Sequence, residues 1–229
     1  MLFWPRELMI DQRDLVRKLS STAADTENPL SWFEELYMMA NRDERLIPWS
    51  DGNPNPILVD WAIGKPTGKA IVVGSGLGDD AAFLDDRGWQ VTAFDISSTA
   101  IDWSRERFGQ SSVRWMVADL LNLPMDWIGG FDLVLEIHTL QAMPEELRAA
   151  AAKKLAPLVS ENGQLVCIGR YASGDVGIEG PPWPLERSFI EGIGQDLGRM
   201  NLVNFRLPFD EISVTRFRAT WERSMVKIN

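Results

Sequence analysis

Three glycines at alternate positions, Gly74, Gly76 and Gly78, follow a short apolar run in this chain. Glycine tolerates positive φ and has no side chain, so such a turn between a strand and a helix lets the backbone approach a nucleotide closely. The dinucleotide fingerprint G-x-G-x-x-G needs its third glycine at position 79, which is Asp79 here. A pyrophosphate would also meet the carboxylates of Asp79 and Asp80 where it needs bare N–H groups. The loop therefore favours an uncharged or cationic nucleotide ligand.

A second acidic residue lies at the end of the next expected strand, residues 90–94. This residue, Asp95, comes 95 − 74 = 21 residues after Gly74. At that offset a strand-end carboxylate reaches the diol of a ribose. The spacing predicts a ribose contact, and the alternative is an ordinary βαβ unit that ends in a surface aspartate.

Composition restricts the class of protein further. The chain has 229 residues, a net charge of −10 and a pI near 4.7, which argues against nucleic acid as a partner. No apolar run approaches the ~20 residues of a membrane span. The single cysteine, Cys167, and the single histidine, His138, exclude an internal disulfide and the usual metal sites. We expect a cytoplasmic protein, monomeric or homodimeric, that acts on a small molecule without a metal, nucleic acid or a membrane.

The elements that would position these residues alternate between strand and helix from residue 69 onward. We expect strands at 70–73, 90–94, 113–118, 131–136 and 164–169, with a turn at 161–163, and helices at 79–87, 98–108 and 144–158. A helix at 185–197 and an antiparallel hairpin of strands 202–207 and 215–224 follow. Strict alternation predicts a parallel sheet with helices on both faces.

The first 56 residues are expected to form a helical segment packed on this sheet. Helices are predicted at 6–20 and 30–40, and a short helix at 57–63 leads into the first strand. Between them, the prolines and glycine of residues 46–56 forbid regular structure. We interpret residues 1–229 as a single domain, with 1–56 as its N-terminal lid segment.

The order of these motifs resembles the class I S-adenosylmethionine-dependent methyltransferases. Such enzymes have a Rossmann-like, three-layer α/β/α fold, with seven strands that are mostly parallel and a C-terminal antiparallel hairpin. The resemblance covers roughly residues 57–229. A narrower resemblance, to the thiopurine methyltransferase-like branch with its thiol and halide methyltransferases, rests on Trp32, Tyr37, the Pro-Trp-Ser-Asp-Gly segment at 48–52 and the Gly-Pro-Pro-Trp segment at 180–183. Ser50, between Trp49 and Asp51, departs from that pattern.

The resemblance implies S-adenosyl-L-methionine as the cofactor. The backbone of the three glycines and Ser75 would run alongside the methionine part of this ligand, and Asp80 would lie near its amino group. An alternative role for Asp80 is to place negative charge at a helix N-terminus, where the dipole favours it. Asp95 would bind the ribose hydroxyls.

The adenine contacts follow from the same resemblance. Ile96 and Ser97 would flank the ring, Asp119 would accept from the adenine amino group, and Leu120 would be its apolar neighbour. A loop acid without a ligand is the alternative for Asp119. Trp32 and Trp49 would cover the cofactor as a lid, because aromatic faces attract a sulfonium, or would simply pack in the core.

The methyl acceptor is less sharply defined. His138, with an ordinary pKa near 6.5, and Glu136 are candidate bases, and the alternative for each is a structural role. Trp49, His138 and Trp183 are candidates to contact the acceptor. Residues 136–139 read Glu-Ile-His-Thr where thiol and halide members carry Asp-Tyr-Thr-Phe-like residues. We favour a methyltransferase with a sulfur or other soft acceptor. The alternatives are a methyltransferase that acts on oxygen or nitrogen of a small metabolite, a nicotinamide-dependent reductase, and a non-catalytic relative.

Overall fold

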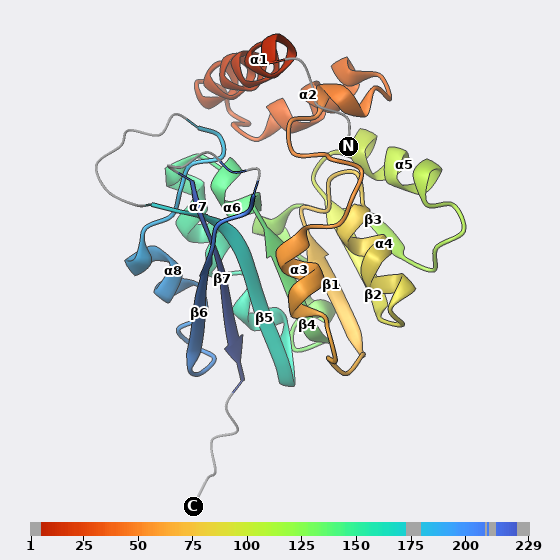
Figure 1. The fold of residues 1–229 in the computed structure, drawn as a ribbon, viewed down its shortest axis with the longest axis vertical. Helices are drawn as coiled ribbons and strands as arrows, with labels where there is room; N and C mark the ends of the chain where they lie inside the picture. The colour runs from red at the N-terminus through yellow and green to blue at the C-terminus, as the bar shows by residue number, and fades with distance from the viewer. Residues whose placement is uncertain (1–5, 173–179, 209, 211–213, 224–229) are drawn as a thin grey trace, which may run out of the picture.

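The structure, a computed structural model, describes residues 6–172, 180–208, 210 and 214–223. Its centre is a seven-stranded sheet with the order β3-β2-β1-β4-β5-β7-β6 (Figure 1). Strands β1 to β5 pair in parallel, whereas β7 is antiparallel to both β5 and β6. The strands are β1 (Lys69–Val73), β2 (Gln90–Asp95), β3 (Arg114–Val117), β4 (Phe131–Ile137), β5 (Val159–Tyr171), β6 (Met200–Phe205) and β7 (Thr215–Glu222).

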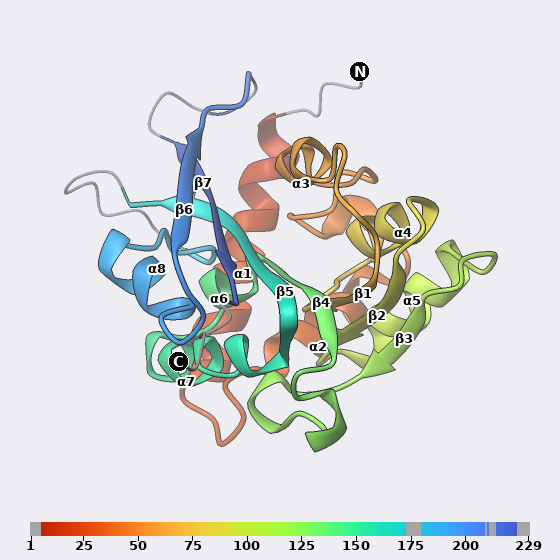
Figure 2. The same cartoon turned by 90° about the horizontal axis from the view of Figure 1, so that it is seen from below.

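Helices cover both faces of the sheet because successive strand side chains alternate between two cores. Ile71 and Val73 of β1 belong to one core, whereas Ala70 and Val72 belong to the other. Figure 2 shows one set of helices on each side of the strands. The first core receives α6 (Thr139–Ala142), α7 (Glu145–Ala152) and α8 (Arg187–Ile193), and the second receives α3 (Pro56–Trp61), α4 (Asp79–Asp86) and α5 (Ser98–Arg107). The predicted three-layer class and C-terminal hairpin are confirmed.

Two predicted elements differ from the structure for local reasons. The expected turn at 161–163 lies inside β5, where the pairing with β4 jumps from Phe131–Val159 to Leu133–Gln164. Gly163 permits this irregularity, because a Cβ there would lie 2.6 Å from the Phe131 carbonyl oxygen. The expected helix 144–158 ends at Ala152, and a short 3₁₀ helix at Ala156–Leu158 follows, since Pro157 cannot continue an α-helix.

The N-terminal segment packs against α5 and the glycine loop (Figure 1). It contains α1 (Arg6–Ala24), α2 (Ser31–Ala40) and a 3₁₀ turn at Glu44–Leu46. Leu36 and Tyr37 of α2 are buried together with Leu77 of the loop and Trp103 of α5. The carboxylate of Glu34 accepts hydrogen bonds from the hydroxyls of residues 97, 98 and 99, where α5 begins. Among the described residues, no helix has the length and apolar character needed to cross a bilayer.

Candidate active site

The glycine loop takes a conformation that side chains disfavour. Gly74, Gly76 and Gly78 have φ values of 60°, 52° and 90°. Gly74 also lies against Thr139, whose hydroxyl donates to the Val73 carbonyl at 3.0 Å, so a Cβ at position 74 would clash with that side chain. A Cβ on Gly78 would lie 2.6 Å from the Trp115 ring. Both backbone conformation and close packing therefore require glycine here.

The side chain of Asp95 joins the end of β2 to the glycine loop. Asp95 is 6% exposed, and its carboxylate accepts from the backbone N–H groups of Gly76 and Ser97, each at 2.9 Å. Burial raises the pKa of this carboxyl, whereas the backbone hydrogen bonds oppose that rise. Each oxygen keeps a further lone pair, so Asp95 can also accept from a ligand hydroxyl.

The two acids at the start of α4 have different environments. Asp79 pairs with Arg107 at 2.9 Å, so its charge is compensated and is a weaker argument against a phosphate than the sequence indicated. Asp80 accepts from the backbone N–H of Asn55 at 2.7 Å, which links α4 to the loop before α3. Burial raises the pKa of the Asp80 carboxyl to about 7, and Asp79 and Asp51 add to the effect.

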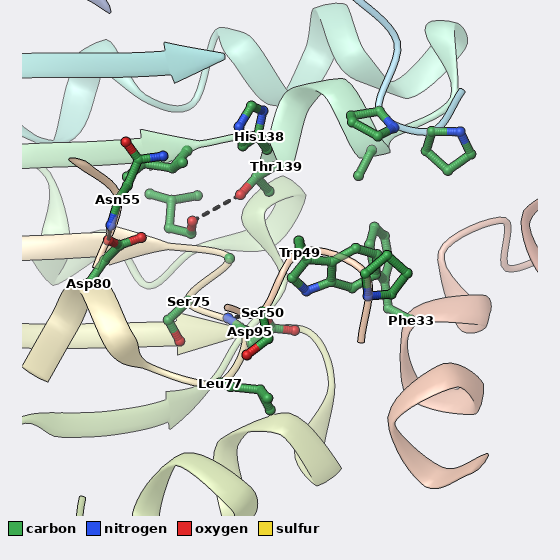
Figure 3. Close-up of a pocket in the computed structure, with 18 of the residues that line it drawn as sticks. Phe33, Trp49, Ser50, Asn55, Ser75, Leu77, Asp80, Asp95, His138 and Thr139 are labelled. Carbon is green, nitrogen blue, oxygen red and sulfur yellow. Dashed lines mark hydrogen bonds between the residues drawn. The ribbon is translucent and has the colours of Figure 1, made fainter. Parts of the chain in front are cut away.

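These loops enclose a pocket of about 790 Å³ between the carboxyl ends of the strands and the N-terminal segment. Figure 3 shows Phe33 and Trp49 on one side of this pocket and Asn55 and Asp80 on the other. Trp49 is held by a hydrogen bond from its indole N–H to the Tyr37 hydroxyl at 3.0 Å. Ten of the predicted site residues line the pocket: Trp49, Gly74, Ser75, Gly76, Asp80, Asp95, Ile96, Asp119, Leu120 and His138.

Three predicted cofactor residues lie behind the pocket wall instead. Trp32 is fully buried, because it lies on the inner face of α2, and it stacks on Phe33 with ring centroids 3.9 Å apart. Ser97 is also fully buried and caps α5 by accepting from the Ala100 N–H at 3.0 Å. Gly78 is the residue before α4 and lies under Trp115. Phe33, which the sequence analysis missed, occupies the pocket face expected for Trp32.

Two predicted acceptor-site residues also lie outside the lining. Glu136 is 1% exposed and accepts from the Leu140 N–H at 3.0 Å, so its carboxylate supports the turn after β4. Trp183 lies beneath the Arg148 guanidinium, 5.6 Å from the ring centroid, whereas Pro181 and Pro182 of the same segment line the pocket. No sequence pattern around Glu136 or Trp183 indicates whether the side chain points into the pocket or away from it.

His138 is a weaker base than its sequence position indicates. It has φ 60° and immediately precedes α6, and its Nδ1 lies 2.9 Å from the Gln141 amide oxygen. Burial lowers the pKa of His138 to about 4, despite the bond to Gln141, and the positive charges of Arg216 and Arg170 contribute to the decrease. The imidazole is therefore neutral at physiological pH.

Two arginines that the sequence analysis missed line the same end of the pocket. Arg170 is near the end of β5 and Arg216 near the start of β7, two strands that pair with each other. Arg216 forms an ion pair with Asp210 at 2.7 Å. Antiparallel pairing brings these positions together across 46 residues of sequence (216 − 170), which no local pattern reveals. The pocket thus has acids near the glycine loop and arginines near His138.

Comparison with known proteins agrees with this geometry. Residues 70–163 match a family described as a methyltransferase domain. The chain is 27% identical over 160 residues to Thiocyanate methyltransferase 1 of Arabidopsis thaliana, covering 68% of this chain and 70% of that protein. It is 25% identical over 190 residues to Probable thiol methyltransferase 2 of the same plant, covering 81% and 79%. The N-methyltransferase NodS of Bradyrhizobium japonicum WM9, solved with S-adenosyl-L-homocysteine, superposes with a TM-score of 0.59 at 12% identity, covering 93% and 100%.

A seven-stranded sheet of this order, with a glycine loop after β1 and an acid after β2, is the arrangement of a Rossmann-like nucleotide-binding fold. The matched domain and these relatives support a class I S-adenosylmethionine-dependent methyltransferase, and the chain is similar to the thiol methyltransferase branch.

Proposed function

We propose that this methyltransferase transfers the methyl group to the sulfur of a small molecule. The observation that carries the proposal is the acceptor end of the pocket, where a neutral His138 lies near Arg170 and near the ion pair of Arg216 with Asp210. A positive field lowers the pKa of a nearby thiol and favours an electron-rich sulfur, and such a nucleophile needs no strong base. The names of the Arabidopsis relatives, a thiocyanate and a probable thiol methyltransferase, support the same choice.

The pocket residues fit the cofactor. The positive φ at Gly76 turns bare backbone toward the pocket, and a Cβ there would approach the Tyr37 hydroxyl at 3.1 Å. Asp95 would hold the ribose hydroxyls, and Asp80 would attract the amino group of the methionine part. Asp119, which caps the 3₁₀ turn at Leu120–Asn122, would face the adenine. When bound, S-adenosyl-L-methionine supplies a methyl group on a sulfonium, whose thioether is already a good leaving group.

The N-terminal segment would exclude water from this reaction. Phe33, Tyr37 and Trp49 line the pocket opposite the strand ends, and Trp49 is 37% exposed. Their aromatic faces suit a cationic donor. In this proposal residues 1–229 form one domain, with residues 1–56 as its lid. The enzyme acts in the cytoplasm as a monomer or homodimer, and its substrate is a thiopurine-like or other small sulfur compound.

Matched acceptors test the choice of sulfur. The enzyme is incubated with S-adenosyl-L-methionine and one acceptor at a time. One matched set is thiophenol and phenol, and the other is an aliphatic thiol with the corresponding alcohol and amine. Formation of S-adenosyl-L-homocysteine and the methylated product are measured by mass spectrometry. We expect turnover with the thiols and none with their oxygen and nitrogen counterparts. Faster methylation of phenol or the amine would refute the proposal, and a micromolar dissociation constant for NADH would favour a reductase.

A further inference from the structure

The side-chain amide of Gln141, in α6, has hydrogen-bond partners for both its nitrogen and its oxygen. Gln141 is 1% exposed, and its amide nitrogen donates to the carbonyl oxygens of Arg170 at 2.8 Å and Trp183 at 2.7 Å. Its amide oxygen accepts from the Arg170 backbone N–H at 2.7 Å and lies 2.9 Å from His138 Nδ1. Gly169 leaves room for this amide, because a Cβ at that position would clash with it. One side chain therefore joins the ends of β4 and β5 to the Gly-Pro-Pro-Trp segment.

These partners determine which way the amide points. The Arg170 and Trp183 carbonyls can only accept, so the NH₂ group faces them, and the Arg170 N–H can only donate, so the oxygen faces it. The group opposite His138 Nδ1 is then an acceptor, and Nδ1 must carry a proton. In a neutral imidazole the lone pair lies on Nε2. No hydrogen bond among the described residues uses Nε2, and His138 lines the pocket.

We propose that Gln141 is a positioning residue that fixes His138 as the Nδ1–H tautomer, so that Nε2 takes the proton from a thiol acceptor. The inference rests on the proposed function for its acceptor. As the sulfur forms its bond to the methyl carbon, the donor sulfur–carbon bond breaks and its electron pair stays on the donor sulfur. The S–H electron pair stays on the acceptor sulfur, and the proton passes to Nε2 and then to water.

Charged groups around the imidazole determine how stable its protonated form is. Arg170 of β5 and Arg216 of β7 oppose the imidazolium, whereas Asp210 favours it and is itself paired with Arg216. Gln141 adds no charge of its own, so it orients the ring without making it a strong base. The proton returns to solvent readily, and the ring is again neutral for the next acceptor.

Nuclear magnetic resonance tests the tautomer directly, because His138 is the only histidine of the chain. The protein is prepared without a histidine tag, and long-range ¹H–¹⁵N correlations of the imidazole are recorded without ligand and with S-adenosyl-L-homocysteine. We expect the Nδ1–H pattern in both samples. An Nε2–H pattern, or equal mixing of the two tautomers, would overturn the inference whether or not the enzyme methylates sulfur.

Two substitutions separate positioning from structural support. Gln141→Leu and Gln141→Glu both remove the donors to Arg170 and Trp183, but only glutamate still accepts from Nδ1–H. Gln164→Leu on β5, whose amide donates to Glu222, is the matched control. We expect Gln141→Leu to mix the tautomers, and Gln141→Glu and Gln164→Leu to keep the Nδ1–H form.

Turnover is compared between a thiol of high pKa, bound with its proton, and one of low pKa, present as thiolate. In Gln141→Leu the kcat for the high-pKa thiol, divided by the kcat for the low-pKa thiol, should fall by about tenfold, because the mixed tautomers keep part of a contribution that is typically about 10²–10⁴-fold. Gln141→Glu should restore the ratio. Equal losses with both thiols, or the same ratio in Leu and Glu variants, would reduce Gln141 to a structural residue. If the leucine variant does not fold, the tautomer of the wild-type protein still decides.

Discussion

The carboxylate of Asp95 accepts a hydrogen bond from the backbone N–H of Gly76 at 2.9 Å, across 19 residues of sequence. Its other oxygen accepts from Ser97, which begins the turn into α5. One buried side chain therefore holds the glycine loop, the end of β2 and the start of α5 in a fixed relation. The same carboxylate lines the pocket, so support of the loop and contact with a ligand depend on one residue.

Replacing Asp95 with alanine should weaken binding of S-adenosyl-L-methionine by roughly 1.5–3 kcal/mol, the typical value for a lost hydrogen bond to a charged group. The loss of the Gly76 contact adds to the loss of the ribose contact. Isothermal titration calorimetry measures the change, and Asp102→Ala is the control, because Asp102 is an exposed acid of α5 that pairs with Arg105. Unchanged affinity in a folded Asp95→Ala variant would contradict the assignment.

The carboxyl of Asp80 should make cofactor binding depend on pH. Burial raises its pKa from 3.8 to about 7, so the folded protein without ligand holds this proton where the unfolded chain has lost it. The stability that this group contributes is present below pH 3.8 and is lost as pH rises through about 7. A ligand ammonium prefers the ionised carboxylate, so affinity should rise between about pH 5.5 and 7.5.

Asp80→Asn isolates that effect, since asparagine can still accept from the Asn55 N–H. We expect the variant to lose the rise in affinity with pH. We also expect its free energy of unfolding to increase relative to the wild-type protein between about pH 4 and 8, as measured with urea. Parallel pH profiles of the two proteins in both experiments would show that Asp80 titrates normally and does not contact the amino group.

The contact between α2 and α5 should be a measurable part of the stability. Glu34 accepts from the Ser97 hydroxyl at 2.5 Å and from the Thr99 hydroxyl at 2.7 Å, so it caps α5 from outside that helix. Glu34→Ala should lower the free energy of unfolding by about 1–2 kcal/mol, as loss of a helix cap does. Glu35→Ala, at the exposed neighbouring position, should change it little. A similar decrease in both variants would mean that the cap contributes nothing specific.

Two glycine substitutions should separate backbone strain from steric clash. Gly64 has φ 69° and open space where a Cβ would lie, whereas Gly74 has φ 60° and its Cβ would clash with Thr139. Gly64→Ala should therefore cost about 1 kcal/mol of stability from strain alone. Gly74→Ala should cost more and should also weaken cofactor binding, because the loop must move. Thermal unfolding and calorimetry report both effects, and equal losses at the two positions would exclude a role for the clash.

The layered fold could be predicted from local sequence patterns, and so could the residues proposed for the cofactor end of the site. The strand and helix alternation follows from local periodicity, and the need for glycine at 74, 76 and 78 follows from backbone sterics. The position of Asp95 follows from its distance along the chain to the loop. Such features depend on residues that are near neighbours in sequence, so one chain suffices to predict them.

Which side chains face the pocket, and which partners they contact, depends on how the helices and strands pack together. Trp32 and Phe33 are adjacent in sequence, yet the rotation of α2 buries the first and turns the second into the pocket. The pairing of Asp79 with Arg107 and the bond between Gln141 and Trp183 join residues 28 and 42 positions apart. These contacts arise when separate helices and strands pack together, and neither residue type nor local spacing determines that packing.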